Sequence, residues 1–134
     1  MKQKWLPEKF ELIAVNDCSI DNSEFIVTEM QRKFNNIKYI SLDKNYGVAY
    51  ARNIGINTSK YQYLSFIDQD DTWVINKLEL QKEYLNSEAN YLTGLQSFKL
   101  FGTNKLPIWF KEKWASNPQD GHVFGTLLIE KKSF

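Results

Sequence analysis

Short hydrophobic runs alternate with amphipathic stretches along this chain. Strand-like runs of apolar, β-branched and aromatic residues lie at residues 10–15, 37–42 and 61–67, and weaker ones at residues 91–101 and 123–129. Apolar residues at helical spacing follow the first three runs, at residues 24–34, at residues 48–57 and after Thr72. Because strands alternate with helices, we predict an α/β fold with a parallel sheet and right-handed crossovers.

Local signals mark the expected helix starts. Asp21, with Glu24 three residues later, resembles a capping box, and Thr72 is the expected N-cap of the third helix. Ile75 and Leu78 fall on one face of that third helix, together with Leu85. These signals predict the positions at which the first and third helices begin.

Composition narrows the classes of protein. The chain has 134 residues, of which 43% are hydrophobic and 15% aromatic, so it holds one core at most and is not disordered. The net charge of +1 gives no support to a nucleic-acid partner. The single cysteine excludes an internal disulfide and a thiolate-rich zinc site. No apolar run reaches the roughly 18 residues of a membrane span, and the first residues lack the core of a signal peptide. We therefore expect a cytoplasmic protein, with peripheral attachment at the inner face of the membrane as an alternative.

Three carboxylates follow the third strand-like run, at Asp68, Asp70 and Asp71. In an open parallel sheet, ligands bind beyond the carboxyl ends of the strands. Clustered carboxylates repel one another when they lose water, and a divalent cation with oxygen ligands, such as Mg²⁺ or Mn²⁺, relieves that repulsion. The alternative is an acidic turn that starts a helix, where negative charge suits the helix dipole. The segment alone leaves both interpretations open.

Two further candidates are weaker alone. Asp17 follows the first strand-like run and is suited to bind a ring N–H or a hydroxyl, but on its own an Asx-type turn with a helix cap is the favoured explanation. Arg52, in the second helical stretch, is suited to phosphate or to stacking on a base, although a solvated helix arginine is the commoner case. Cys18 as a nucleophile would need a base, and the single histidine, His122, lies far away in the sequence.

In combination these segments resemble the family-2 glycosyltransferases of the GT-A fold. The matching stretches are Glu11–Ser23 with its Asn-Asp-Cys-Ser loop, Asn45-Tyr46-Gly47, Ala51-Arg52-Asn53-Ile54-Gly55-Ile56, Tyr63–Trp73 with its Asp-Gln-Asp-Asp run, and Lys77-Leu78-Glu79-Leu80-Gln81. The resemblance covers residues from about 10 to 85, and the last dozen residues weakly. It implies a GT-A (Rossmann-like) sheet flanked by helices.

The resemblance also implies roles for single residues. Asp17 would contact the base, commonly uracil, and Arg52 would line the nucleotide site. Asp68 would approach the ribose or the donor sugar. Asp70 would be the chief protein ligand of Mg²⁺ or Mn²⁺, with Asp71 in support. The metal would stabilise the negative charge that develops on the diphosphate leaving group.

Departures from the family pattern are equally informative. Asn16 stands where the family often has Asp, and Cys18 where it has Gly, so a positive φ at Cys18 would be strained. The family's first strand, with its Pro-x-Tyr/Phe-Asn loop, and the acceptor-side C-terminal half with its general base have no counterpart. An inverting transfer needs such a base, and only proximity suggests Asp120 or Glu130. The catalytic residue therefore stays unassigned.

We therefore predict that residues 1–134 form a single partial glycosyltransferase domain. Residues 10–85 would be the nucleotide-sugar-binding half, and residues 91–134 would begin the acceptor-side region. The resemblance implies a metal-dependent, inverting activity that moves a sugar from a nucleotide sugar, commonly a UDP-sugar, to an acceptor hydroxyl. The alternative is a truncated, non-catalytic nucleotide-binding remnant or a partner-dependent module.

The resemblance implies partners as well. They are a nucleotide-sugar donor and a glycan or lipid-linked acceptor, as in polysaccharide biosynthesis. The sequence does not specify the donor sugar, the acceptor or the linkage. Because a missing strand would leave unpaired backbone groups at a sheet edge, we also expect self-association.

Overall fold

The computed structural model describes residue 3 and residues 9–83, 91–92, 95–96, 119–120 and 128–133. The chain divides into two compact units, and each is described by itself. The N-terminal unit is Leu6–Leu64, and the C-terminal unit is Ser65–Phe134 together with Met1–Trp5. The predictions for Leu85 and for His122 concern residues outside the described part of the chain.

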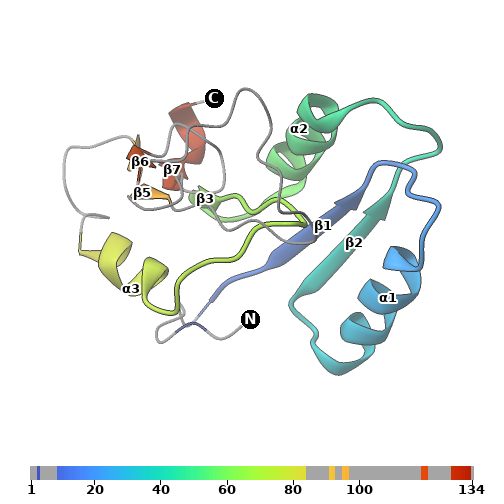
Figure 1. Ribbon diagram of the computed structural model, residues 1–134, viewed down its shortest axis with the longest axis horizontal. Coiled ribbons are helices and arrows are strands. Elements are labelled where there is room, and N and C mark those ends of the chain that lie inside the picture. Colours follow the sequence, from blue (N-terminus) through green and yellow to red (C-terminus); the bar gives the residue numbers. More distant parts are fainter. Residues whose placement is uncertain are drawn as a thin grey trace, which may run out of the picture. The chain divides into compact units, whose positions relative to one another are not determined.

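The N-terminal unit is a parallel strand pair with two helices. Its elements are β1 (Leu12–Asn16), α1 (Ser23–Lys33), β2 (Ile37–Ser41) and α2 (Val48–Thr58). The strands pair in parallel over their whole length, from Leu12 opposite Ile37 to Asn16 opposite Ser41. Helix α1 connects the two strands, as parallel pairing requires, and the ribbon of this unit shows the crossover (Figure 1). This confirms the predicted α/β pattern of parallel strands and helices.

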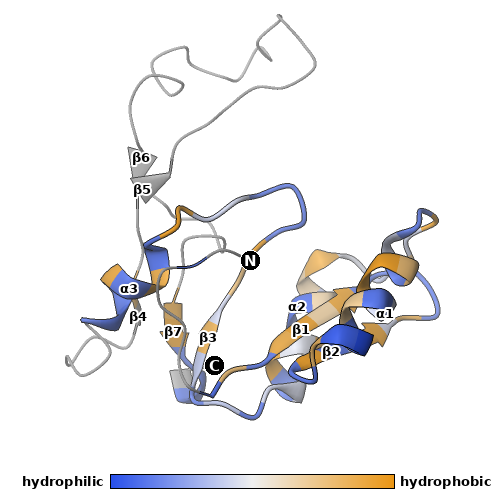
Figure 2. Ribbon diagram, turned by 90° about the horizontal axis from the view of Figure 1, so that it is seen from below, coloured by the Kyte–Doolittle hydropathy of each residue, from blue (hydrophilic) through white to orange (hydrophobic). Residues whose placement is uncertain are grey.

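Both helices pack on the strand pair. Helix α1 contacts mainly β2, and α2 contacts β1. Hydrophobic residues lie along β1 and β2 and also occur on the two helices (Figure 2). Helix α2 packs directly on β1 at Gly55, where an added Cβ would lie 3.7 Å from Cγ2 of Val15, an ordinary van der Waals distance. Ile56, the next residue of α2, is buried. The packing therefore fixes the carboxyl end of β1 relative to the start of α2.

The C-terminal unit is built from short elements. They are α3 (Lys77–Lys82), β4 (Tyr91–Leu92), β5 (Leu95–Gln96), β6 (Gln119–Asp120), β7 (Leu128–Glu130) and a 3₁₀ turn at Lys131–Ser133. The preceding strand is β3 (Tyr63–Ser65), at the boundary between the units in the sequence. The pair β4–β7 is antiparallel, as is the separate pair β5–β6.

Several predicted boundaries are wrong. The strand predicted at residues 61–67 is limited to Tyr63–Ser65. The helix expected after Thr72 begins only at Lys77, with Asn76 as its N-cap. Thr72, Trp73, Val74 and Ile75 are β-branched or aromatic, and such residues lose side-chain freedom in a helix.

The capping box predicted at Asp21 and Glu24 is also absent. Asn22 is the N-cap residue of α1, and its side chain makes no capping hydrogen bond. Asp21 acts locally instead: its Oδ1 accepts a hydrogen bond of 3.0 Å from the backbone N–H of Ser23. Bonds from the backbone and side chain of Ser23 lower the pKa of Asp21, the side-chain bond contributing most.

The helices give no sign of a membrane span. Within the described ranges, none combines the length and the apolar character that crossing a bilayer requires.

Candidate functional site

Asp17 joins the end of β1 to the loop before α2. Its Oδ1 accepts a hydrogen bond of 2.8 Å from the backbone N–H of Tyr46, and its Oδ2 accepts one of 2.8 Å from that of Gly47. Hydrogen bonds to a carboxylate are short and strong compared with neutral ones. The half-buried Asp17 therefore holds the β2–α2 loop against the carboxyl end of β1.

The turn around Asp17 is tightly constrained. The side-chain amide of Asn16 donates to the hydroxyl of Tyr39 at 2.8 Å, and its Oδ1 accepts the backbone N–H of Ser19 at 2.8 Å. Between them Cys18 adopts a φ of +60°, the left-handed region that favours glycine. The strain expected from a cysteine at this position is therefore present.

The start of α2 is the second part of this site. Gly47 has a φ of +90° and a ψ of 158°, a conformation that only glycine adopts readily, and its N–H also lies 3.1 Å from Oδ1 of Asn45. The loop presents aromatic surface, because the rings of Tyr46 and Tyr50 stack with centroids 4.6 Å apart. Arg52 lies one turn into α2 and is half-buried. Asp17 and Arg52 thus belong to one rigidly connected corner of the N-terminal unit.

Asp68, Asp70 and Asp71 lie in one turn of the C-terminal unit. The backbone N–H of Asp71 donates to the carbonyl of Asp68 at 3.1 Å and closes a turn, which we call the acidic turn (Asp68–Asp71). Partial burial raises the pKa of Asp71, and the charges of Asp70 and Asp68 raise it further. The direction of this pKa shift is the one expected for neighbouring carboxylates that are partly removed from water.

The acidic turn suits a divalent cation only if water or phosphate oxygens supply part of the coordination shell. Among the described residues, no three His, Cys, Asp or Glu side chains gather closely enough to hold a metal by themselves. Mg²⁺ commonly binds through one or two carboxylates and completes its shell with water and phosphate oxygens. Two adjacent oxygen donors, Asp70 and Asp71, fit that kind of site. The donor set is thus appropriate to a metal that arrives with a phosphate ligand.

Lys77 is a residue of this region that sequence reasoning missed. It begins α3, and its Nζ donates to Oγ of Ser65 at 2.9 Å and to Oε1 of Gln81 at 2.9 Å. The same ammonium lies 4.1 Å from the ring centroid of Trp73. The available signal was the spacing, since Trp73, Lys77 and Gln81 follow one another at intervals of four residues.

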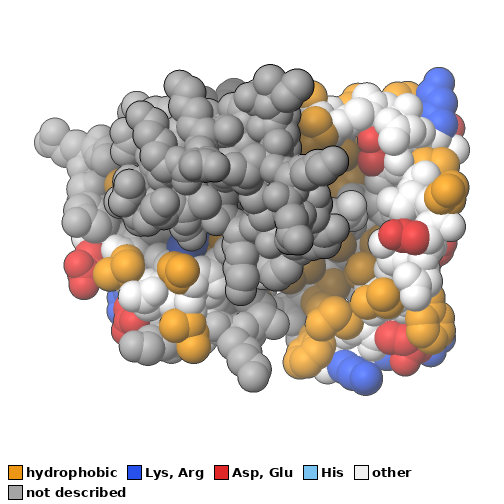
Figure 3. All heavy atoms as spheres, in the orientation of Figure 1, with side chains coloured by type: hydrophobic (Ala, Val, Ile, Leu, Met, Phe, Trp, Pro, Cys, Tyr) orange, Lys and Arg blue, Asp and Glu red, His pale blue; other side chains and the backbone are white. Residues whose placement is uncertain are grey.

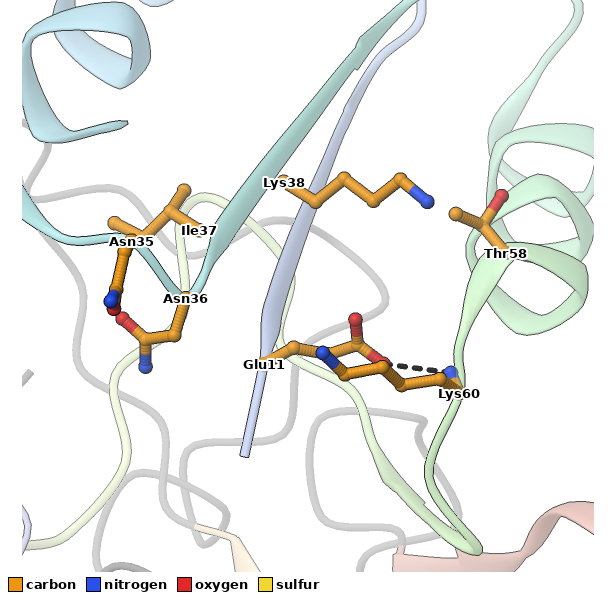
Figure 4. A pocket seen from close by; sticks show the side chains of 7 residues that line it. All are labelled: Glu11, Asn35, Asn36, Ile37, Lys38, Thr58 and Lys60. Carbon is orange, nitrogen blue, oxygen red and sulfur yellow. Dashed lines mark hydrogen bonds between the residues drawn. The ribbon is translucent and has the colours of Figure 1, made fainter. Parts of the chain in front are cut away.

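A separate cavity of about 330 Å³ opens at the other end of the parallel strand pair (Figure 4). The backbone N–H of Lys60 donates to Oε1 of Glu11 at 2.7 Å across part of it. Its lining residues are Glu11, Asn35, Asn36, Ile37, Lys38, Thr58 and Lys60. None of the predicted site residues is among them, so this cavity is distinct from the corner formed by Asp17 and α2.

Comparison with known proteins supplies the family. Residues 1–125 match the sequence profile described as Glycosyl transferase family 2. The minor teichoic acid biosynthesis protein GgaB of Bacillus subtilis (strain 168) is 45% identical over 123 residues, which cover 91% of this chain and 13% of GgaB. The Escherichia coli UDP-Glc:alpha-D-GlcNAc-diphosphoundecaprenol beta-1,3-glucosyltransferase WfgD is 30% identical over 98 residues, 72% of this chain and 37% of WfgD.

A solved structure has the same fold. The crystal structure of S. aureus TarS 1-349 in complex with UDP superposes with a TM-score of 0.69 at 20% identity, covering 97% of this chain and 40% of that one. The chain therefore spans well under half the length of these relatives. The profile match covers almost the whole chain, and on that ground the chain belongs to glycosyl transferase family 2, whose members have the GT-A fold.

Proposed function

We propose that this chain forms the donor-binding part of a glycosyltransferase that moves a sugar from a UDP-sugar to an acceptor hydroxyl. The observation that carries the proposal is the acidic turn, closed by the hydrogen bond from Asp71 to Asp68, in which partial burial and then the neighbouring carboxylates raise the pKa of Asp71. Such a cluster suits a cation that also binds a diphosphate. The likeness to TarS, solved in complex with UDP, and to WfgD, named as a UDP-Glc transferase, supports the choice of uridine.

Each site residue has a proposed role. Asp17 and Arg52 would bind the nucleotide from the corner at the start of α2, and Asp68 would approach the ribose or donor sugar. Asp70 would be the chief metal ligand, supported by Asp71. When bound, Mg²⁺ or Mn²⁺ supplies stabilisation of the negative charge on the leaving diphosphate.

The acceptor side is proposed by analogy with a relative. WfgD is named for an acceptor in which a sugar is carried on diphosphoundecaprenol. We propose a glycan or lipid-linked acceptor of that chemical class for this chain, with inversion at the transferred sugar carbon. Inversion needs a general base, and no described residue is assigned to that role.

Calorimetric titration with UDP tests the donor site directly. In the presence of Mn²⁺ the wild-type chain is expected to bind UDP, and chelation of the metal should weaken binding at least tenfold. Asp70→Ala should remove this metal dependence, because it removes the chief protein ligand. Glu79→Ala, at an exposed position of α3, is the matched control and should titrate as wild type. A titration of Asp70→Ala that is unchanged in affinity and in metal dependence would overturn the metal assignment.

A further inference from the structure

The ammonium group of Lys77 is enclosed at the first turn of α3. The residue is only 9% exposed, and so is Gln81, which accepts one of its hydrogen bonds. Burial lowers the pKa of Lys77 to about 8, because an ammonium is less stable away from water. Burial removes hydration from the Lys77 ammonium that a surface lysine keeps. The contacts of this ammonium therefore call for a functional explanation.

Those contacts lie on both sides of the acidic turn. Ser65, at the end of β3, precedes Asp68 by three residues and accepts a hydrogen bond of 2.9 Å from Nζ. Trp73 follows Asp71 by two residues, and its ring face lies 4.1 Å from the same nitrogen. A single cation therefore contacts the segments that enter and leave the turn. Gln81 contacts it at 2.9 Å from the next turn of α3.

This arrangement restricts the turn without touching its carboxylates. A hydrogen bond and a cation–π contact, both made by the buried ammonium of Lys77, hold Ser65 and Trp73 near the same point. The residues between them include Asp68, Asp70 and Asp71, two of which are exposed. Exposed carboxylates that repel one another spread apart unless the ends of their loop are fixed.

We propose that Lys77 is a positioning residue, which holds Ser65 and Trp73 together at the base of the acidic turn and so keeps Asp70 and Asp71 in place for the metal and the donor. The inference deepens the proposed function and rests on it for the identity of the ligand. The restraint of the turn by Lys77, however, is a property of the free protein. The two parts can be tested separately.

The first test needs no ligand. Lys77→Met keeps an apolar, unbranched stem of four heavy atoms but removes the ammonium group, and Lys82→Met, at an exposed position of α3, is the matched control. By ¹⁵N NMR, Lys77→Met should shift the amide resonances of residues 68–71 and raise their exchange with solvent at least tenfold. Lys82→Met should leave them unchanged, and Lys77→Arg should restore part of the protection. Wild-type resonances and exchange at residues 68–71 in Lys77→Met would overturn the proposal.

Circular dichroism shows whether Lys77→Met folds. If it does not, Ser65→Ala takes its place, because that variant removes one acceptor and leaves the lysine. It should give the same pattern of shifts at residues 68–71 with a smaller amplitude, and an unperturbed turn would again contradict the proposal.

The second test measures UDP binding by calorimetry with Mn²⁺. Lys77→Met should bind at least tenfold more weakly than wild type, Lys77→Arg should fall between them, and Lys82→Met should match wild type. If wild type binds UDP and Lys77→Met binds equally well, positioning of the donor site by Lys77 is wrong. If wild type itself fails to bind UDP, the proposed function fails, while the NMR result still decides whether Lys77 restrains the turn.

Discussion

Among described residues other than glycine, Cys18 alone has a positive φ, at +60°. For a residue with a Cβ, this conformation costs about 1–2 kcal/mol. The turn is imposed by its neighbours, because Asn16 binds the N–H of Ser19 and Asp17 binds two amides of the β2–α2 loop. The strain at Cys18 therefore accompanies the contacts that place Asp17.

Replacing Cys18 by glycine should stabilise the protein. Relief of the strained φ exceeds the added freedom of the unfolded chain, so Cys18→Gly should raise the free energy of unfolding by about 0.5–1 kcal/mol. Ser19→Gly is the control at an exposed neighbour without positive φ, and it should lower that free energy by about 0.5 kcal/mol. Urea denaturation measures both. Equal destabilisation by the two variants would contradict the strain at Cys18.

At the scale of single residues, the sequence indicated candidate functional residues by their type, but it did not reveal which residues they contact. It identified Asp17 as a candidate ligand-binding residue, and that role stays a prediction. It did not reveal the two backbone amides that bind the Asp17 carboxylate, which lie 29 and 30 residues further along the chain. Lys77 was missed for a similar reason, since a lysine in a helical stretch usually lies in solvent. Only the folded chain places Ser65 and Trp73 around its ammonium.

Two glycines, one before helix α2 and one within it, have opposite requirements. Gly47, before the helix, has a φ of +90°, and a Cβ added there would meet no atom within 4 Å. This position therefore requires glycine because of its backbone φ, and not because a Cβ would collide with a neighbouring atom. Gly55 lies within the helix, where a Cβ would make ordinary van der Waals contact with Val15 at 3.7 Å. Alanine has the higher helix propensity at such a position.

The two alanine substitutions should therefore act in opposite directions. Gly47→Ala should lower the free energy of unfolding by about 2 kcal/mol, because alanine is strained in that conformation. Gly55→Ala should raise it by about 0.5–1 kcal/mol. Thermal and urea unfolding measure these changes. If Gly55→Ala destabilises as strongly as Gly47→Ala, then α2 packs on β1 too tightly to accept a methyl group.

Elements with strong local patterns were predicted well, and elements fixed by distant contacts were not. The predicted ranges for α1, β2 and α2 agree with the structure to within one residue at each end, because apolar spacing and turn residues define them locally. The start of α3 was wrong, since Trp73 lies against Lys77 instead of beginning the helix. Hydrogen bonds of Gln3 to Val74 and Leu78 also involve residues more than 70 positions apart, which no local pattern can reveal.

The described surface of the molecule retains much apolar area. Ile56 and Leu128 are the described hydrophobic residues that are buried, whereas α1 and its C-cap expose Ile26 (50%), Met30 (41%) and Phe34 (51%). Ile26 and Met30, four residues apart, lie along one side of the helix, and Phe34 directly follows its end; we call the three residues the α1 stripe. Hydrophobic side chains gather in that region in the space-filling view, at the lower right (Figure 3). Contiguous apolar surface of this kind favours association.

The α1 stripe gives the predicted self-association a testable surface. Light scattering should yield a mass above 15.8 kDa that increases with protein concentration. The double variant Ile26→Lys/Met30→Lys should move the mass toward the monomer, because a lysine charge opposes burial of the stripe against another molecule. Val74→Lys, at an apolar position 67% exposed in the other unit, is the control and should leave association unchanged.

The sheet of β1 and β2 has two strands among the described residues, so its edges are a second candidate surface. Association that persists in the double variant would point to those edges, and a monomer at every concentration would show that the prediction of self-association is wrong.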